Sequence, residues 1–144
     1  MKPFFAFAAL LLAGCGRPEP SAITVEDGWA RATVAGQNSA AAYLTIINRG
    51  GGDDRLIEVA VPRAGQAMLH SSTMDSGVMR MRHLADGLAI PANATVELAP
   101  NGTHIMLTGL TAPLRPNELL PATLDFSRAG PKQVTILVKQ ADAQ

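Results

Sequence analysis

The sequence predicts an all-β protein with a sandwich or barrel architecture, and three observations support this fold class. Short β-branched or alternating apolar segments recur about every ten residues, separated by Gly, Pro, Asn and Asp. No stretch shows a convincing apolar stripe with the period of an amphipathic helix. The chain has 144 residues and is 47% hydrophobic, which is a size and composition typical of one compact domain. Regularly spaced short strands of this kind are typical of sandwiches and barrels.

Each expected strand is a run of β-branched, aliphatic or alternating residues that ends at turn residues. The alanines of 39–42 favour helix, but Tyr43-Leu44-Thr45-Ile46-Ile47 follows without a break, so this segment is predicted to be extended. In chain order, the expected strands are Ile23–Glu26, Trp29–Thr33, Ala41–Asn48, Asp54–Val61, Ala67–Ser71, Val78–Leu84, Thr95–Leu98, His104–Leu110, Thr123–Phe126 and Gln133–Lys139.

The N-terminal residues are typical of an export signal. Lys2 precedes an apolar run over residues 4–13 that is too short to span a bilayer as a helix. The sequence Leu12-Ala13-Gly14-Cys15 resembles a bacterial lipobox, in which the cysteine is acylated and becomes the first residue of the mature chain. We therefore expect a lipoprotein-type signal peptide over residues 1–14 and a lipidated tether over 15–21, anchored to a membrane at Cys15, before a sandwich domain over 22–144. An ordinary secretory cleavage site with an incidental cysteine is the alternative.

Charge and cysteine content argue against several classes of function. The chain has 12 Lys and Arg against 12 Asp and Glu and no basic run, so nucleic acid is not expected as a partner. Cys15 is the single cysteine, which rules out a disulfide framework and a CxxC site. No Ser/His/Asp set or pair of carboxylates stands out, so the chain is not expected to be an enzyme.

Thioether and imidazole side chains are concentrated in one part of the chain. Five of the six methionines and all three histidines lie between Met68 and Met106. The segment Met74-Asp75-Ser76-Gly77 has a turn signature and separates two alternating runs, which predicts a β-hairpin over residues 68–83.

The position of this turn determines which side chains face each other. We expect the turn to be centred between Asp75 and Ser76. Directly opposed residues of a hairpin have Cβ atoms about 4.5–5.5 Å apart, close enough for an imidazole and a thioether to meet one ion. A register shift of one residue would move these side chains to opposite faces. The predicted cross-strand pairs are His70 with Met81, Met68 with His83, and Ser72 with Met79.

A second donor pair lies in the strand that includes residues 103–107. The two-residue period of a strand puts His104 and Met106 on one side and Ile105 and Leu107 on the other, which is expected to pack inward. Imidazole and thioether donors without carboxylates suit Cu(I) better than Mg, Ca or Mn, and the lack of thiolate disfavours structural zinc.

The predicted Cu(I) ligands are His70, Met81, His104 and Met106. Methionines on strands commonly fill gaps in a core, and His83 falls outside this set. Whether Met68, Met74, Met79 or His83 assists binding is left open by the residues alone.

The ligand spacing also resembles that of a known family. Ten residues separate His70 from Met81, and 22 separate Met81 from the His104-x-Met106 pair. This closely resembles the motif of the PCuAC family of periplasmic copper chaperones, usually written H-x10-M-x21-H-x-M, with one extra residue that the turns of 91–101 are expected to absorb. The segments Trp29–Thr33, Ala40–Ile46 and Met79–Arg82 are also similar to the family.

The resemblance implies a cupredoxin-like Greek-key sandwich in the periplasm. It further implies a Cu(I) carrier that delivers copper for the CuA centre of cytochrome c oxidase subunit II, directly or together with Sco-type copper proteins. Because no ligand cysteine is present, a blue-copper electron-transfer centre is not expected. Two alternatives remain: copper sequestration or resistance at the same site, and a metal-free envelope β-sandwich that binds proteins.

Overall fold

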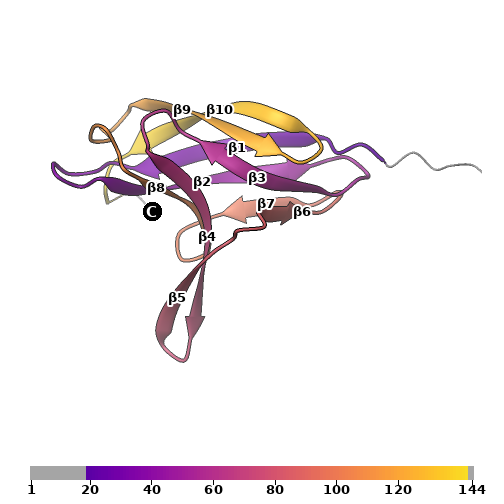
Figure 1. The fold of residues 1–144 in the computed structure, drawn as a ribbon, viewed down its shortest axis with the longest axis horizontal. Helices are drawn as coiled ribbons and strands as arrows, with labels where there is room; N and C mark the ends of the chain where they lie inside the picture. Colours follow the sequence, from indigo (N-terminus) through magenta and orange to yellow (C-terminus); the bar gives the residue numbers. More distant parts are fainter. Residues whose placement is uncertain (1–18, 143–144) are drawn as a thin grey trace, which may run out of the picture.

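Residues 19–142 are described by the computed structural model, and within this range the chain forms strands and turns without a helix (Figure 1). Together the strands account for the all-β class predicted from the sequence. In chain order they are β1 (Ile23–Arg31), β2 (Ser39–Asn48), β3 (Asp54–Ala60), β4 (Gln66–Asp75), β5 (Val78–His83), β6 (Leu88–Ile90), β7 (Thr95–Leu98), β8 (Thr103–Thr108), β9 (Leu119–Phe126) and β10 (Gly130–Lys139).

The strands belong to one continuous hydrogen-bonded sheet. Its order is β5-β4-β8-β2-β1-β10-β9-β3-β6, and β7 pairs with a second stretch of β2. Neighbouring strands are antiparallel except for β1 and β10, which are parallel. The sheet curls back on itself, so that β3 lies close to β4 although no ladder joins them. The resulting two layers enclose the core, while the β4–β5 hairpin projects away from them (Figure 1).

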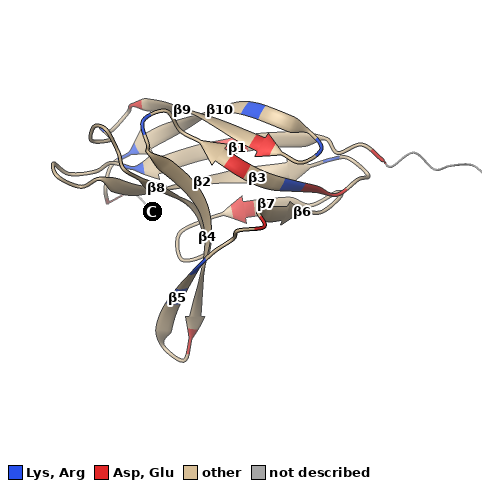
Figure 2. Cartoon of the chain, viewed as in Figure 1, with Lys and Arg blue, Asp and Glu red and all other residues tan. Residues whose placement is uncertain are grey.

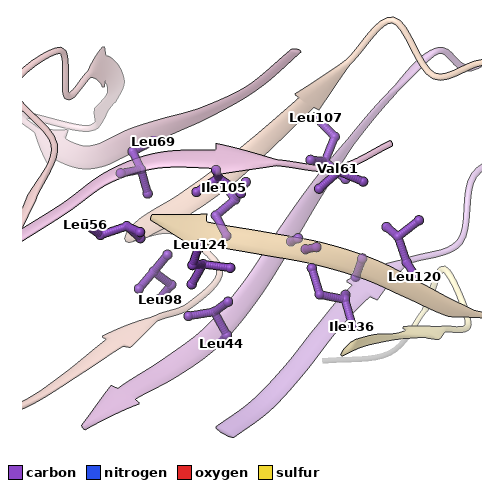
Figure 3. Close-up of a cluster of buried hydrophobic side chains, with 14 of the residues drawn as sticks. Leu44, Leu56, Val61, Leu69, Leu98, Ile105, Leu107, Leu120, Leu124 and Ile136 are labelled. Carbon is purple, nitrogen blue, oxygen red and sulfur yellow. The ribbon is translucent and has the colours of Figure 1, made fainter. Parts of the chain in front are cut away.

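Alternating side chains of the strands fill the space between the layers. The hydrophobic cluster between them includes Leu44 and Ile46 of β2, Leu124 of β9 and Ile136 of β10, and all four are at most 2% exposed. Figure 3 shows aliphatic side chains from strands distant in sequence pointing toward one another. Burial of such side chains is the main favourable term in folding, so the core positions the strands that carry the donors.

Most of the predicted strands are confirmed, although several bounds differ, as at β4, which runs to Asp75 instead of Ser71. The two strands expected over 23–33 are one strand, β1, interrupted by a bulge between Glu26 and Trp29 where Asp27 has a φ of 52°. Strand β6 was not predicted, because three residues are too few to show a period of two. Strand β9 starts before the predicted Thr123 and includes Pro121, a residue that is uncommon inside paired strands.

The expected signal peptide (residues 1–14), Cys15 and the first part of the expected tether lie outside the described residues. At the end of that tether, Ser21 Oγ donates a hydrogen bond to Asp54 Oδ2 at 2.6 Å, and the Pro20 carbonyl accepts one from the Gly52 N–H. Residues 20 and 21 therefore pack on the domain. Between residues 19 and 142, no helix has the length and apolar content needed to cross a membrane.

The Asp54 carboxylate joins separate segments at this end of the domain through hydrogen bonds. Besides the Ser21 hydroxyl, it accepts hydrogen bonds from the backbone N–H groups of Arg55, Arg128 and Ala129. Burial alone raises the pKa of Asp54, but these hydrogen bonds favour the charged form more strongly and lower it below the ordinary value. The ionised side chain thus holds the start of β3 to the segment after β9.

Candidate metal centre

The β4–β5 hairpin is closed by a two-residue turn, Ser76-Gly77. Both residues have positive φ values, 50° and 81°, as a type I′ hairpin turn requires. A Cβ added at Gly77 would meet no atom within 4 Å, so the backbone conformation, and not packing, calls for glycine there. All residues of β5 are exposed, which agrees with a hairpin that projects from the sandwich (Figure 1).

The predicted register of this hairpin is wrong by two residues. The predicted pairs were His70 with Met81, Met68 with His83, and Ser72 with Met79. The turn is centred between Ser76 and Gly77, one residue later than expected, because both loop positions need positive φ. Since side chains alternate with a period of two, a shift of two keeps every side chain on its predicted face. The observed pairs are His70 with His83, Ser72 with Met81, and Met74 with Met79.

Strand β4 also pairs with β8 on its other side, which joins the two predicted donor groups. His70 is directly opposite His104, and Met68 is directly opposite Met106. The reverse face of β8 carries Ile105, which is fully buried in the core as predicted. One face of three adjacent strands therefore presents all four predicted ligands.

Two donor atoms of this face, from His70 and Met81, lie close together. Nδ1 of His70 lies 3.2 Å from Sδ of Met81, and the rings of His70 and His104 have centroids 5.9 Å apart. Met106 follows His104 by two residues on the same face of β8, about 6.7 Å along the strand. Within residues 19–142, no three His, Cys, Asp or Glu side chains are placed to hold a metal ion.

His104 is held in one tautomer by the backbone. Its side chain is buried, with 5% of its surface exposed, and its Nδ1 lies 3.0 Å from the carbonyl oxygen of Gly102. A carbonyl oxygen can only accept a hydrogen bond, so Nδ1 carries a proton, and Nε2 is the nitrogen that can offer a lone pair to a metal. A backbone partner of this kind is typical of histidines that bind metals.

His70 is poised to be neutral near physiological pH. Burial lowers its pKa below the ordinary value, and the neighbouring His104 and His83 rings lower it further. A neutral imidazole has a free lone pair and no proton to lose before it binds a metal. The imidazole of His70 is thus an uncharged donor.

His83 also lies on this face, directly opposite His70. The predicted register placed it opposite Met68. The centroids of the His70 and His83 rings are 5.6 Å apart. The position of His83 could have been found from the turn, because assigning both Ser76 and Gly77 to the loop gives the observed pairing of His83 with His70. Of the methionines left open, Met68 lies beside Met106, whereas Met74 and Met79 pair near the hairpin tip.

Sequence comparison identifies the family of the chain. Residues 23–138 match the family model described as "Putative lipoprotein LpqE-like". The chain is also 34% identical over 117 residues to the "Putative lipoprotein Lxx21020" of Leifsonia xyli subsp. xyli (strain CTCB07), covering 81% of this chain and 69% of that protein.

Solved structures with the same fold include copper-bound forms of two other proteins. The copper-bound PCuAC domain from PmoF2 aligns with a TM-score of 0.68 at 25% identity, covering 82% of this chain and 92% of that domain. The solution structure of CuI-DR1885 from Deinococcus radiodurans aligns with a TM-score of 0.62 at 30% identity, covering 88% and 83% of the two chains. The predicted cupredoxin-like β fold is therefore confirmed, and the chain belongs to the LpqE-like family and, as its motif predicted, is a PCuAC family protein.

Proposed function

We propose that this protein is a copper chaperone that binds Cu(I) through His70, Met81, His104 and Met106. The observation that carries the proposal is the 3.2 Å approach of His70 Nδ1 to Met81 Sδ beside the buried His104 ring. The copper-bound PCuAC domain from PmoF2 and CuI-DR1885 support copper as the metal, and the second supports its Cu(I) state.

The spacing of the donors suits a four-coordinate ion. An imidazole nitrogen and a sulfur at typical metal distances of about 2.0 and 2.3 Å are roughly 3.5 Å apart in a tetrahedral site. The observed separation between His70 Nδ1 and Met81 Sδ is close to this edge length, so these two donors need little movement to share an ion. Two soft thioethers and two imidazoles favour Cu(I) over harder divalent ions.

The unequal burial of the ligands suits carriage better than permanent storage. His104 is buried and its ring is held by a hydrogen bond to the Gly102 carbonyl, whereas Met81 is 51% exposed on β5. A donor from a recipient protein can therefore approach from the Met81 side and replace the ligands one at a time. The cargo ion stays Cu(I), and no covalent bond of the protein is broken.

The cellular setting of the proposal comes from the N-terminal sequence and the PCuAC resemblance. Acylation at Cys15 would anchor the chain to a membrane facing the periplasm. The recipient is then the CuA site of cytochrome c oxidase subunit II, reached directly or together with Sco-type copper proteins. The match to the LpqE-like lipoprotein family supports the exported, lipidated state.

Cu(I) titration of the chain without residues 1–15 tests the proposal. Wild type is compared with His70→Ala, Met81→Leu, His104→Ala and Met106→Leu, and X-ray absorption counts nitrogen and sulfur neighbours. We expect two of each in wild type and weaker binding in every variant. Unchanged affinity in all four variants would refute the site. Absence of Cu(I) uptake by wild type would favour the metal-free binding module.

Transfer separates a chaperone from a sequestering protein. The loaded wild-type chain is mixed with the apo form of a soluble CuA domain, with and without a Sco-type protein. A chaperone is expected to fill the CuA site faster than the same amount of Cu(I) complexed to a chelator of equal affinity. Retention of Cu(I) by the loaded chain would favour sequestration.

A further inference from the structure

Two methionines near the tip of the β4–β5 hairpin do not pack in the core. Met74 and Met79 are directly opposed across the hairpin, and 65% and 48% of their surfaces are exposed. Methionines on strands commonly fill gaps in a core, and exposure excludes that explanation for these two residues. The presence of two methionines at these exposed positions therefore needs an explanation other than core packing.

Met74 and Met79 lie on the same face of the hairpin as Met81. Met79 and Met81 are two positions apart in β5, about 6.7 Å along the strand, and so point to the same side. Met74 is opposite Met79, where directly opposed Cβ atoms are about 4.5–5.5 Å apart. Flexible thioether side chains at these three positions can close around one ion beyond the Ser72–Met81 row.

The charged residues of the hairpin are on its other face. Asp75 and Arg80 form an ion pair there at 3.4 Å, and Arg82 lies on the same side. Figure 2 shows how few charged residues interrupt the hairpin. The donor face of residues 66–83, a segment that the structure describes completely, carries no Asp, Glu, Lys or Arg. A soft monovalent ion on that face meets neither a hard carboxylate nor a repelling cation.

We propose that Met74, Met79 and Met81 form a second, outer Cu(I) position through which the ion leaves the inner site. This inference rests on the proposed function, because Met81 would belong to both positions. The bonds from copper to His70, His104 and Met106 break while bonds to Met79 and Met74 form, and Met81 stays bound throughout. Copper remains Cu(I), and no proton moves because thioethers have none to release.

The outer position would bring the ion to an exposed part of the molecule. The hairpin tip stands clear of the sandwich (Figure 1), so a recipient can contact an ion there without meeting the two layers of strands. Three thioethers without imidazole nitrogen form a weaker set than the mixed inner ligands. The ion therefore rests at the inner site and visits the outer one, as a relay requires.

The first experiment isolates the outer position. The His70→Ala/His104→Ala variant is titrated anaerobically with Cu(I) supplied as its acetonitrile complex, and bound copper is examined by X-ray absorption. We expect weak residual binding with sulfur as the only protein donor. Adding Met74→Leu and Met79→Leu to the same variant is expected to abolish it. Equal residual binding with and without these two methionines, or none in either variant, overturns the relay.

The second experiment uses exposed positions only and so does not depend on the folding of a variant that lacks the buried His104. Met74→Leu/Met79→Leu is compared with wild type in the rate of Cu(I) transfer to a chromophoric chelator. We expect transfer to slow several-fold while the equilibrium affinity for Cu(I) is unchanged. The matched control is Val78→Leu, an apolar replacement at the hairpin tip on the opposite face, which should transfer at the wild-type rate.

The outcomes distinguish a relay from an apolar docking surface and from failure of the inner site. Leucine preserves the size and apolarity of methionine, so a docking surface predicts no change with the leucine variant. A wild-type rate for that variant therefore overturns the relay. If wild type takes up no Cu(I), the relay and the proposed function both fail. If copper binding depends on the four inner ligands but the tip variant transfers normally, only the relay fails.

Discussion

Replacing Met81 with leucine separates metal binding from folding. Met81 is 51% exposed on a strand that is exposed along its whole length, and leucine has a similar volume. The free energy of unfolding of the metal-free protein is therefore expected to change by less than about 0.5 kcal/mol. Loss of a residue that only hydrogen-bonds to a metal ligand typically costs about 10–100-fold in metal affinity. Loss of a direct donor should therefore cost at least about tenfold, or about 1.4 kcal/mol.

Two measurements on the same samples check this prediction. Anaerobic competition for Cu(I) with a chromophoric chelator gives the affinity, and urea unfolding without copper gives the stability. The control is Met81→Leu/Val78→Met, which restores the number of methionines but places the thioether on the opposite face of β5. It should bind as weakly as Met81→Leu. Wild-type affinity in Met81→Leu, or rescue by Val78→Met, would refute the assignment of this donor and face.

Three further variants test the site and its support. His104→Ala is expected to weaken Cu(I) binding and to lower the free energy of unfolding by about 1–3 kcal/mol, because a buried ring and its hydrogen bond to Gly102 are lost; titration and urea unfolding measure the two effects. Leu124→Ala, at a fully buried core position, should cost about 2–5 kcal/mol in urea unfolding yet leave the Cu(I) affinity of the folded protein unchanged. Asp54→Asn should lower stability near neutral pH by about 1–3 kcal/mol, since the ionised carboxylate accepts four hydrogen bonds. Because the pKa of Asp54 is lowered in the folded state, its stabilisation is complete above the ordinary value of 3.8 and is lost as the pH falls through the folded pKa. In denaturation measured as a function of pH, the free energies of unfolding of wild type and Asp54→Asn should therefore converge as the pH falls below the folded pKa of Asp54.

The face on which each donor lies could be predicted from the sequence even where its partner could not. His70 and Met81 were assigned to one face of the hairpin, and a register error of two residues left that assignment intact. The same error misplaced His83, whose closeness to His70 depends on which two residues form the turn. Strand β6, which pairs with β3, could not be predicted either, because three residues are too few to show a period of two.

The sequence by itself determined the donor types, their spacing, the alternation that turns Ile105 inward and His104 to the donor face, and the general β character of the chain. These properties follow from the period of two that the covalent geometry of any extended segment imposes. The tertiary structure alone decided that β4 pairs with both β5 and β8, so that His70 lies between His83 and His104. It also decided that His104 is buried and that burial lowers the pKa of His70. Strand order and burial depend on contacts between distant segments around a shared core, and no local pattern of residues encodes them.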